Sequence, residues 1–126
     1  LPANHSLATK PSLSLADLAP EPLILLDQPL SRDYICRLFT DAGLEPQIAM
    51  RSPSFELVRS LVANDLGYSL LVTKLAAEVS YDGKPLAIRP LMDSTSPISI
   101  CAVSRKGTSP SLAARRFTAL MHDLFA

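Results

Sequence analysis

The chain has 126 residues, 48% of them hydrophobic, and its 12 basic side chains balance 12 acidic ones. This length suits one domain, or one small lobe with part of another, and no cluster of Lys or Arg marks a surface that would bind DNA or RNA by itself. Apolar runs of about 18 residues are absent, which excludes a transmembrane helix.

The first residues and the two cysteines bear on location. No charged leader followed by an apolar stretch opens the sequence, so we expect no signal peptide. Cys36 and Cys101 are too few for a disulfide framework in a chain of this size. These features favour the reducing cytoplasm and predict no membrane partner.

A short helix and a buried strand are predicted near the start. Ser14 can cap a helix that runs to Ala19, and Asp17 in its first turn interacts favourably with the helix dipole. Leu23 to Leu26 form a continuous apolar run bounded by a proline and an aspartate. This pattern is typical of a strand covered on both faces, as in a parallel sheet.

Two further helices and a second strand are predicted next. Apolar residues at helical spacing indicate a helix from Ser31 to Ala42, and Gly43 ends it. Pro46 to Met50 are expected to form a strand. The following helix opens near Ser52, which can cap it, with Pro53 at the first helical position, where a missing N–H costs nothing.

That helix ends near Asn64 and Asp65, and a third strand is predicted from Gly67 to Val72. Strand, helix, strand, helix and strand within about fifty residues imply right-handed crossovers and an open parallel sheet. The predicted fold class is therefore α/β.

Beyond Val72 the pattern changes to shorter elements. We predict a turn over Tyr81–Lys84, strands over Pro85–Leu91 and Ile98–Ser104, and a closing helix over Ser109–Phe125. Apolar residues line one side of that last helix. We interpret this side as a core face, with a dimer surface as the alternative.

Five short segments follow one another in an informative order. They are Leu1–Ala8 (LPANHSLA), Ser14–Leu18 (SLADL), Glu21–Leu25 (EPLIL), Ala42–Pro46 (AGLEP) and Leu61–Leu71 (LVANDLGYSLL). Each motif alone is weak. In this order, over almost the whole chain, they resemble the effector-sensing domain of LysR-type bacterial transcription regulators.

Two positions depart from the family's usual pattern. Asp65 stands just past a helix end, where the family usually has glycine, and Asp tolerates the left-handed conformation better than most residues. Ser6 replaces the usual proline of the first segment, which loosens that segment.

The resemblance implies two α/β lobes with the general fold of type 2 periplasmic binding proteins, and a small effector held between them. Residues 1–75 would form the second lobe with its parallel sheet. Residues 76–126 would supply return strands and a closing helix to an incomplete first lobe. DNA would be bound only through an N-terminal winged helix-turn-helix that this sequence lacks.

An incomplete first lobe would leave part of the closing helix exposed. Exposed apolar area of this kind promotes association, so we expect a homodimer or a higher oligomer.

The strongest ligand signal is the segment from Pro29 to Asp33, between the first long strand and its helix. In an open α/β sheet, ligands bind beyond the carboxyl ends of strands, where free N–H groups at helix starts attract anions. Ser31 can donate a hydroxyl, and Arg32 offers a fork that matches a carboxylate. By similarity, Pro29, Leu30 and Ser31 fall where relatives contact effectors. The alternative is a capped helix with a solvated Arg32 and Asp33.

A second signal lies at the start of the next helix, in Ser52, Ser54 and Phe55. Two helix starts from adjacent strand–helix units would face the same crevice. The alternative explains Ser52 as a cap and Phe55 as a core aromatic. On the first interpretation, the ligand is a small metabolite, most simply an organic anion.

Catalysis is not indicated. His5 and His122 have no carboxylate or nucleophile at informative spacing, and we interpret both as surface residues. For Cys36 and Cys101 we favour inert apolar packing over a peroxide-sensing pair. Metal-binding, hydrolase and phosphate-loop motifs are absent, so we predict no enzyme, no metal and no cofactor.

Two other functions stay open. One is a solute-binding protein of a transport system with the same fold, which would carry a secretion signal upstream. The other is an enzyme on the shared two-lobe fold, since fold alone does not imply function.

Overall fold

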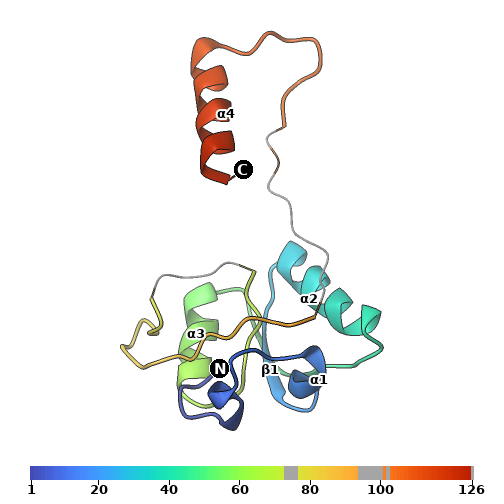
Figure 1. The fold of residues 1–126 in the computed structure, drawn as a ribbon, viewed down its shortest axis with the longest axis vertical. Coiled ribbons are helices and arrows are strands. Elements are labelled where there is room, and N and C mark those ends of the chain that lie inside the picture. Colours follow the sequence, from blue (N-terminus) through green and yellow to red (C-terminus); the bar gives the residue numbers. More distant parts are fainter. Residues whose placement is uncertain (73–76, 94–100, 102, 126) are drawn as a thin grey trace. The chain divides into compact units, whose positions relative to one another are not determined.

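The computed structural model describes residues 1–72, 77–93, 101 and 103–125, and the chain divides into two compact units (Figure 1). The first unit is Leu1–Ser96 and the second is Pro97–Ala126. The boundary predicted at residue 75 between two lobes stays a prediction.

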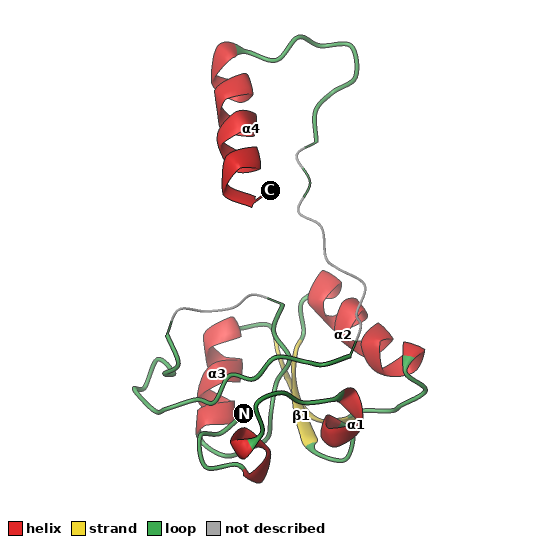
Figure 2. Ribbon diagram, viewed as in Figure 1, coloured by secondary structure: helices red, strands yellow, loops and turns green. Residues whose placement is uncertain are grey.

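Helices and strands alternate along the first unit (Figure 2). Its elements are η1 (Ser6–Thr9), α1 (Leu15–Leu18), β1 (Pro22–Leu26), α2 (Pro29–Asp41), β2 (Gln47–Ser52) and α3 (Phe55–Ala63). The predicted alternation and the α/β fold class are confirmed, with element ends shifted by one to three residues.

The two strands pair in parallel, from Pro22 opposite Gln47 to Leu26 opposite Ser52. On the other side of β1, Tyr68 adds a single parallel bridge: its N–H donates to the Pro22 carbonyl at 2.9 Å, and its carbonyl accepts from the Ile24 N–H at 2.7 Å. Strand β1 is therefore central, with a neighbour on each side.

The third strand, predicted from Gly67 to Val72, is reduced to that bridge at Tyr68. Leu70 and Leu71 still pack on different core clusters, as successive residues of a strand do. The apolar pattern therefore reflects burial on two faces, but the backbone leaves β1 after one paired residue.

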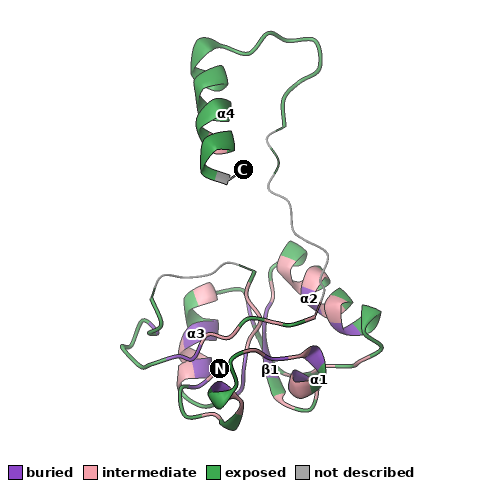
Figure 3. Ribbon diagram, viewed as in Figure 1, coloured by how far each residue is buried: buried purple, intermediate pink, exposed green. Residues whose placement is uncertain are grey.

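Two hydrophobic clusters lie on the two faces of β1 (Figure 3). Leu23 and Leu25 point to one cluster, and Ile24 and Leu26 to the other. The first cluster is completed chiefly by α1 and α2, and the second by α3 with Leu86. All four strand residues are buried, which explains their unbroken apolar run.

The start of α1 follows the prediction. The Ser14 hydroxyl accepts from the Asp17 N–H at 3.1 Å, and the Asp17 carboxylate accepts from the Ser14 N–H at 3.0 Å, which is a complete capping box. Lys10 contacts the same carboxylate at 2.8 Å. The hydrogen bonds from Lys10 and then Ser14 lower the pKa of Asp17 to about 2.

Two helix starts differ from the prediction. Helix α2 begins at Pro29, two residues earlier, because the ring of this proline suits the first helical position. Helix α3 begins at Phe55 with Ser54 as its cap, so the prediction that Ser52 caps it and Pro53 opens it is wrong. Ser52 still belongs to β2, where its carbonyl accepts from the Asp27 N–H at 2.8 Å.

The residue after the end of α3 behaves as predicted from its type. Asp65 has φ 64, in the left-handed region. Asp65 therefore adopts the left-handed conformation that an Asp at this position is expected to tolerate.

Among the described residues after 76, the predicted turn is present but no regular strand. The Gly83 N–H donates to the Ser80 carbonyl at 2.9 Å, within the expected turn. The prediction of a strand from Pro85 to Leu91 is wrong. This stretch has only isolated bridges, to Val79, Pro2 and Leu13. Two prolines in this stretch have no N–H to donate, which interrupts a ladder.

Arg89 holds the same stretch against the start of the chain. Its guanidinium donates to the Ala8 carbonyl at 2.7 and 3.1 Å and to the Lys10 carbonyl at 2.9 Å. The Ala87 N–H also donates to the Leu1 carbonyl at 2.9 Å. Residues 77–93 therefore belong to the first unit.

The second unit contains α4 (Leu112–Phe125), which begins three residues later than predicted. Most of the strand predicted over Ile98–Ser104 lies outside the described residues, and the described ones are not in a strand. The apolar side of α4 is exposed, and its exposed members are Leu112, Phe117, Leu120 and Leu124. Its interpretation as a core face, or as a dimer surface, stays a prediction.

The histidines and cysteines follow the predictions in part. His122 is exposed, but the interpretation of His5 as a plain surface residue is wrong. His5 caps η1 by accepting from the Leu7 N–H at 3.2 Å, and it lies 3.6 Å from the Glu21 carboxylate.

Cys36 packs against the first cluster as expected. Cys101 is exposed, so the prediction of apolar packing is wrong for it.

Candidate functional site

The starts of α2 and α3 lie at one edge of the sheet (Figure 1). Both helices follow parallel strands, so both begin at the carboxyl edge, where ligands of such sheets bind. Two hydrogen bonds join the loops there. The Asp27 N–H donates to the Ser52 carbonyl at 2.8 Å, and the Gln28 side-chain amide donates to the Pro53 carbonyl at 3.0 Å.

The start of α2 exposes backbone donors. Gln28 is its N-cap and provides no side-chain cap, and the Arg32 N–H donates to the Gln28 carbonyl at 2.8 Å as the first helical bond. Leu30 and Ser31 precede that bond, so their N–H groups have no acceptor within the helix. The Leu30 side chain is 88% exposed, and Ser31 is half-buried.

At the start of α3, more of the polar groups are hydrogen-bonded within the protein than at the start of α2. The Ser54 hydroxyl accepts from the Leu57 N–H at 3.3 Å. Ser52 is 4% exposed, and its hydroxyl accepts from the Ser54 N–H at 3.1 Å. Phe55 packs partly against the second core cluster. Of the three residues predicted here, only Ser54 is exposed.

Arg32 is engaged with acidic neighbours. Its guanidinium lies 3.1 Å from Asp27 and 3.1 Å from Asp33. Hydrogen bonds to Asp33, and then to Asp27, raise the pKa of Arg32 above its ordinary value. A ligand carboxylate would have to share or replace these partners, so a direct contact through Arg32 stays a prediction.

Comparison with known proteins now decides the family. A family model described as the LysR substrate binding domain matches residues 1–126. The chain belongs to the LysR substrate-binding domain family. This membership also confirms the predicted fold class, an α/β domain of the LysR effector-binding type.

Similar proteins extend the result. The HTH-type transcriptional regulator TtuA of Agrobacterium vitis is 36% identical over 86 residues, which are 66% of this LysR-family chain and 28% of TtuA.

Two solved structures agree. HinK, a LysR family transcriptional regulator from Pseudomonas aeruginosa, has a TM-score of 0.93 and 39% identity over 100% of this chain and 43% of HinK. The C-terminal domain of a probable LysR family transcriptional regulator from Rhodococcus sp. RHA1 has a TM-score of 0.83 and 33% identity over 97% of this chain and 60% of that one. The LysR-family chain thus spans less than two thirds of the length of each of these relatives.

Sequence reasoning missed two residues that lie at this candidate site of the LysR-family chain. Gln28 links the two loops, and its signal was its place directly before a proline that opens a helix. The Asp27 carboxylate accepts a hydrogen bond from the Arg32 guanidinium, and the Asp27 N–H donates to the Ser52 carbonyl of β2. A polar residue directly after a buried strand, at the ligand-binding edge of the sheet, was the available signal for Asp27.

In the described parts of the LysR-family chain, no three His, Cys, Asp or Glu side chains come together as metal ligands. None of the helices in those parts is both long and apolar enough to cross a membrane.

Proposed function

We propose that this chain is the effector-sensing part of a LysR-type transcription regulator, and that a small organic anion contacts the starts of α2 and α3. The relatives named above are transcription regulators, which favours this function over a solute-binding protein or an enzyme. The whole regulator would bind DNA through an N-terminal winged helix-turn-helix, act in the cytoplasm, and assemble as a homodimer or higher oligomer.

One observation carries the site. The hydrogen bond from Gln28 to Pro53 holds two helix starts at the same sheet edge, and α2 has no side-chain cap. Each helix start carries a partial positive charge and outward N–H groups, so the two together attract an anion. Ser31 would add a hydroxyl donor, and Ser54 would lie within the same site.

The mechanism requires a difference in affinity. An effector bound between residues 1–75 and the other lobe shifts their arrangement only if it binds one arrangement more tightly than the other. That shift would change the regulator's oligomer and hence its DNA contacts.

The effector itself can be found by thermal shift on the intact regulator. A ligand that binds only the folded state raises the melting temperature by mass action. Metabolites with a carboxylate are the first class to screen.

The site is tested by Ser31→Leu in the same intact regulator. We expect the effector concentration for half-maximal response to rise about tenfold or more, because a hydrogen bond to a charged group is worth about 1.5–3 kcal/mol. DNA affinity without effector should stay the same. Ser6→Leu, at an exposed position in η1, is the matched control. A response of Ser31→Leu equal to that of the control would refute the site.

A further inference from the structure

Arg59 is a charged residue on the inner face of α3, between core residues. It is 8% exposed, while the neighbouring Val58 is fully buried. A buried guanidinium destabilises the fold by several kcal/mol unless its charge and its N–H groups are satisfied. The hydrogen-bond partners of Arg59 therefore indicate which parts of the structure it holds together.

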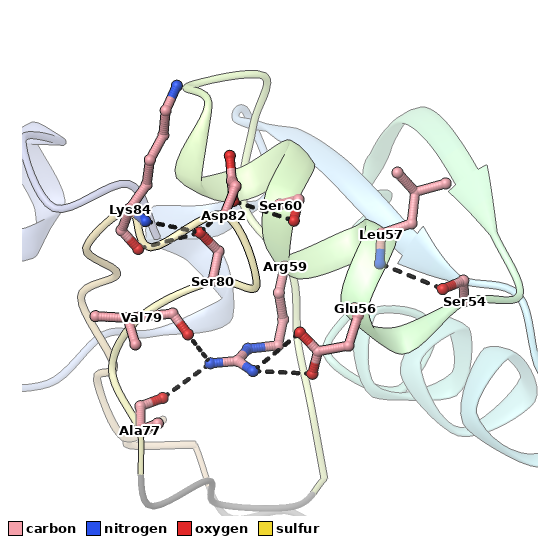
Figure 4. A network of polar contacts seen from close by, with 10 residues as sticks. All are labelled: Ser54, Glu56, Leu57, Arg59, Ser60, Ala77, Val79, Ser80, Asp82 and Lys84. Carbon is pink, nitrogen blue, oxygen red and sulfur yellow. Dashed lines mark hydrogen bonds and ion pairs between the residues drawn. The ribbon is translucent and has the colours of Figure 1, made fainter.

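Those partners come from two parts of the chain (Figure 4). One guanidinium nitrogen donates to the Glu56 carboxylate at 2.9 and 3.3 Å, within the first turn of α3. The other nitrogen donates to the Ala77 carbonyl at 2.8 Å and to the Val79 carbonyl. Arg59 thus joins the beginning of α3 to residues that lie 18 and 20 positions later.

We call residues 77–84 the return segment. It buries little apolar surface of its own: every residue except Ser80 is exposed, including Tyr81 at 89%. Its other side-chain contacts to α3 and the residue after it are at the surface: the Ser60 hydroxyl and the Asn64 amide donate to the Asp82 carboxylate, and the Lys84 ammonium donates to the Asn64 side-chain oxygen. Among the described side chains that contact this segment, Arg59 is the one that is both buried and positively charged.

A segment with few apolar contacts opens locally at low free energy, unless polar contacts restrain it. The contacts of Asp82 and Lys84 with Ser60 and Asn64 are exposed, so solvent weakens them. The two carbonyl contacts of Arg59 are partly buried and involve a full charge, so they are the stronger ones.

We propose that Arg59 is a positioning residue that couples the start of α3 to the return segment, so that a change at the first turn of α3 moves both together. Glu56 lies two residues after Ser54 and is the end of this link nearest the candidate effector site. The use of the link in signalling rests on the proposed function, whereas the link itself does not.

The link is tested by amide hydrogen exchange in the complete protein with Arg59→Met, which keeps a long apolar stem. Three amides report on the return segment, because they donate within it or next to it: Ser80, Gly83 and Leu86. We expect their exchange to accelerate about tenfold or more, while the Ile24 amide of β1 changes by less than about twofold. Arg37→Met, at an exposed position of α2, is the matched control and should change neither group.

Coupling is tested by a double-mutant cycle with Ser54→Ala, which removes the α3 cap. In the wild-type background we expect Ser54→Ala to accelerate exchange at Ser80 and Leu86 by about threefold, and in the Arg59→Met background to add nothing further. A residue with a merely structural role would give equal increments in both backgrounds, and that result would overturn the proposal.

A second variant covers the case in which Arg59→Met unfolds the whole domain. Arg59→Lys retains the charge but has one ammonium group in place of the fork, so it should loosen the return segment and leave β1 protected. Unchanged exchange at Ser80, or equal acceleration at Ser80 and Ile24, would contradict the proposal. None of these measurements needs an effector, so their failure is distinct from a failure of Ser31→Leu to alter the response.

Discussion

The side-chain amide nitrogen of Gln28 lies 3.0 Å from the carbonyl oxygen of Pro53, and this contact fixes the start of α2 beside the turn that precedes α3. The two residues are 25 positions apart in the chain. The short distance between these two side-chain and backbone groups sets the spacing of the two helix starts that form the candidate site.

Gln28→Ala should therefore loosen this spacing. We expect the free energy of unfolding in urea to fall by about 0.5–1 kcal/mol, since the hydrogen bond is neutral and exposed. Gln47→Ala, at an exposed position of β2, is the control with the same change of side chain. If both variants unfold at the same urea concentration, the contact does not stabilise the site.

Gly67 should tolerate no side chain. A Cβ there would lie 2.2 Å from the Pro22 carbonyl oxygen, which accepts from the Tyr68 N–H, and φ is +146. Because the obstacle is backbone of the central strand, it cannot rotate away. Gly67→Ala should lower the free energy of unfolding by about 3 kcal/mol or more.

The matched control is Gly43→Ala, where φ is +68 and no atom lies within 4 Å of the added Cβ. Only backbone strain remains there, so the loss should be about 1 kcal/mol. Similar losses at both positions in urea denaturation would mean that steric overlap at Gly67 is relieved by movement of β1.

The contrast between β1 and α3 shows how far the sequence alone could go. Strand β1 was predictable, because Leu23 to Leu26 are buried on both faces and both faces require apolar residues. For α3, both Ser52 and Ser54 are good caps by residue type. The hydrogen bond from the Asp27 N–H to the Ser52 carbonyl keeps Ser52 in the strand, and that tertiary contact has no signature in the local sequence.

Arg59 marks a second limit. Its spacing from Glu56 indicates an ion pair on a helix surface, which is an ordinary exposed feature. Its burial follows from the carbonyl groups of Ala77 and Val79, which come from a segment far along the chain. Backbone carbonyls carry no residue-type signal, so a pattern of side chains cannot predict such a contact. The candidate helix starts were predictable for the opposite reason, because the order of strands and helices fixes which edge they share.

Asp65 gives a test of backbone strain. It adopts φ 64 just after α3, where a branched side chain is strongly disfavoured. Asp65→Val should lower the free energy of unfolding by about 1–2 kcal/mol. Asp65→Gly should change it by less than about 0.5 kcal/mol, because relief of strain is offset by a more flexible unfolded chain. Equal urea midpoints for the Val and Gly variants would count against strain at this position.

Asp82 should make the return segment sensitive to acid. Its carboxylate accepts from the Ser80 hydroxyl at 2.6 Å, the Asn64 amide at 3.1 Å and the Ser60 hydroxyl at 3.3 Å. These hydrogen bonds, that from Ser80 foremost, lower the pKa of Asp82 from 3.8 to about 2.

The sign of the effect follows from the direction of the shift. A carboxyl group whose pKa is lower in the folded state stabilises the fold above its unfolded pKa, and this stabilisation is lost as the pH falls through the folded value. The loss should therefore fall between pH 3.8 and about 2. Asp17 has a lowered pKa as well and contributes over the same range, so the effect of Asp82 must be measured as a difference between variants.

Asp82→Asn isolates that difference, because the amide has nearly the same shape and does not titrate. We expect the free energy of unfolding to fall less steeply between pH 4 and pH 2 in this variant than in the wild type, as measured by urea denaturation at a series of pH values. Asp41→Asn, at the exposed end of α2, should leave the slope unchanged. If Asp82→Asn and wild type show the same slope, the carboxylate of Asp82 does not hold the return segment in its ionised form.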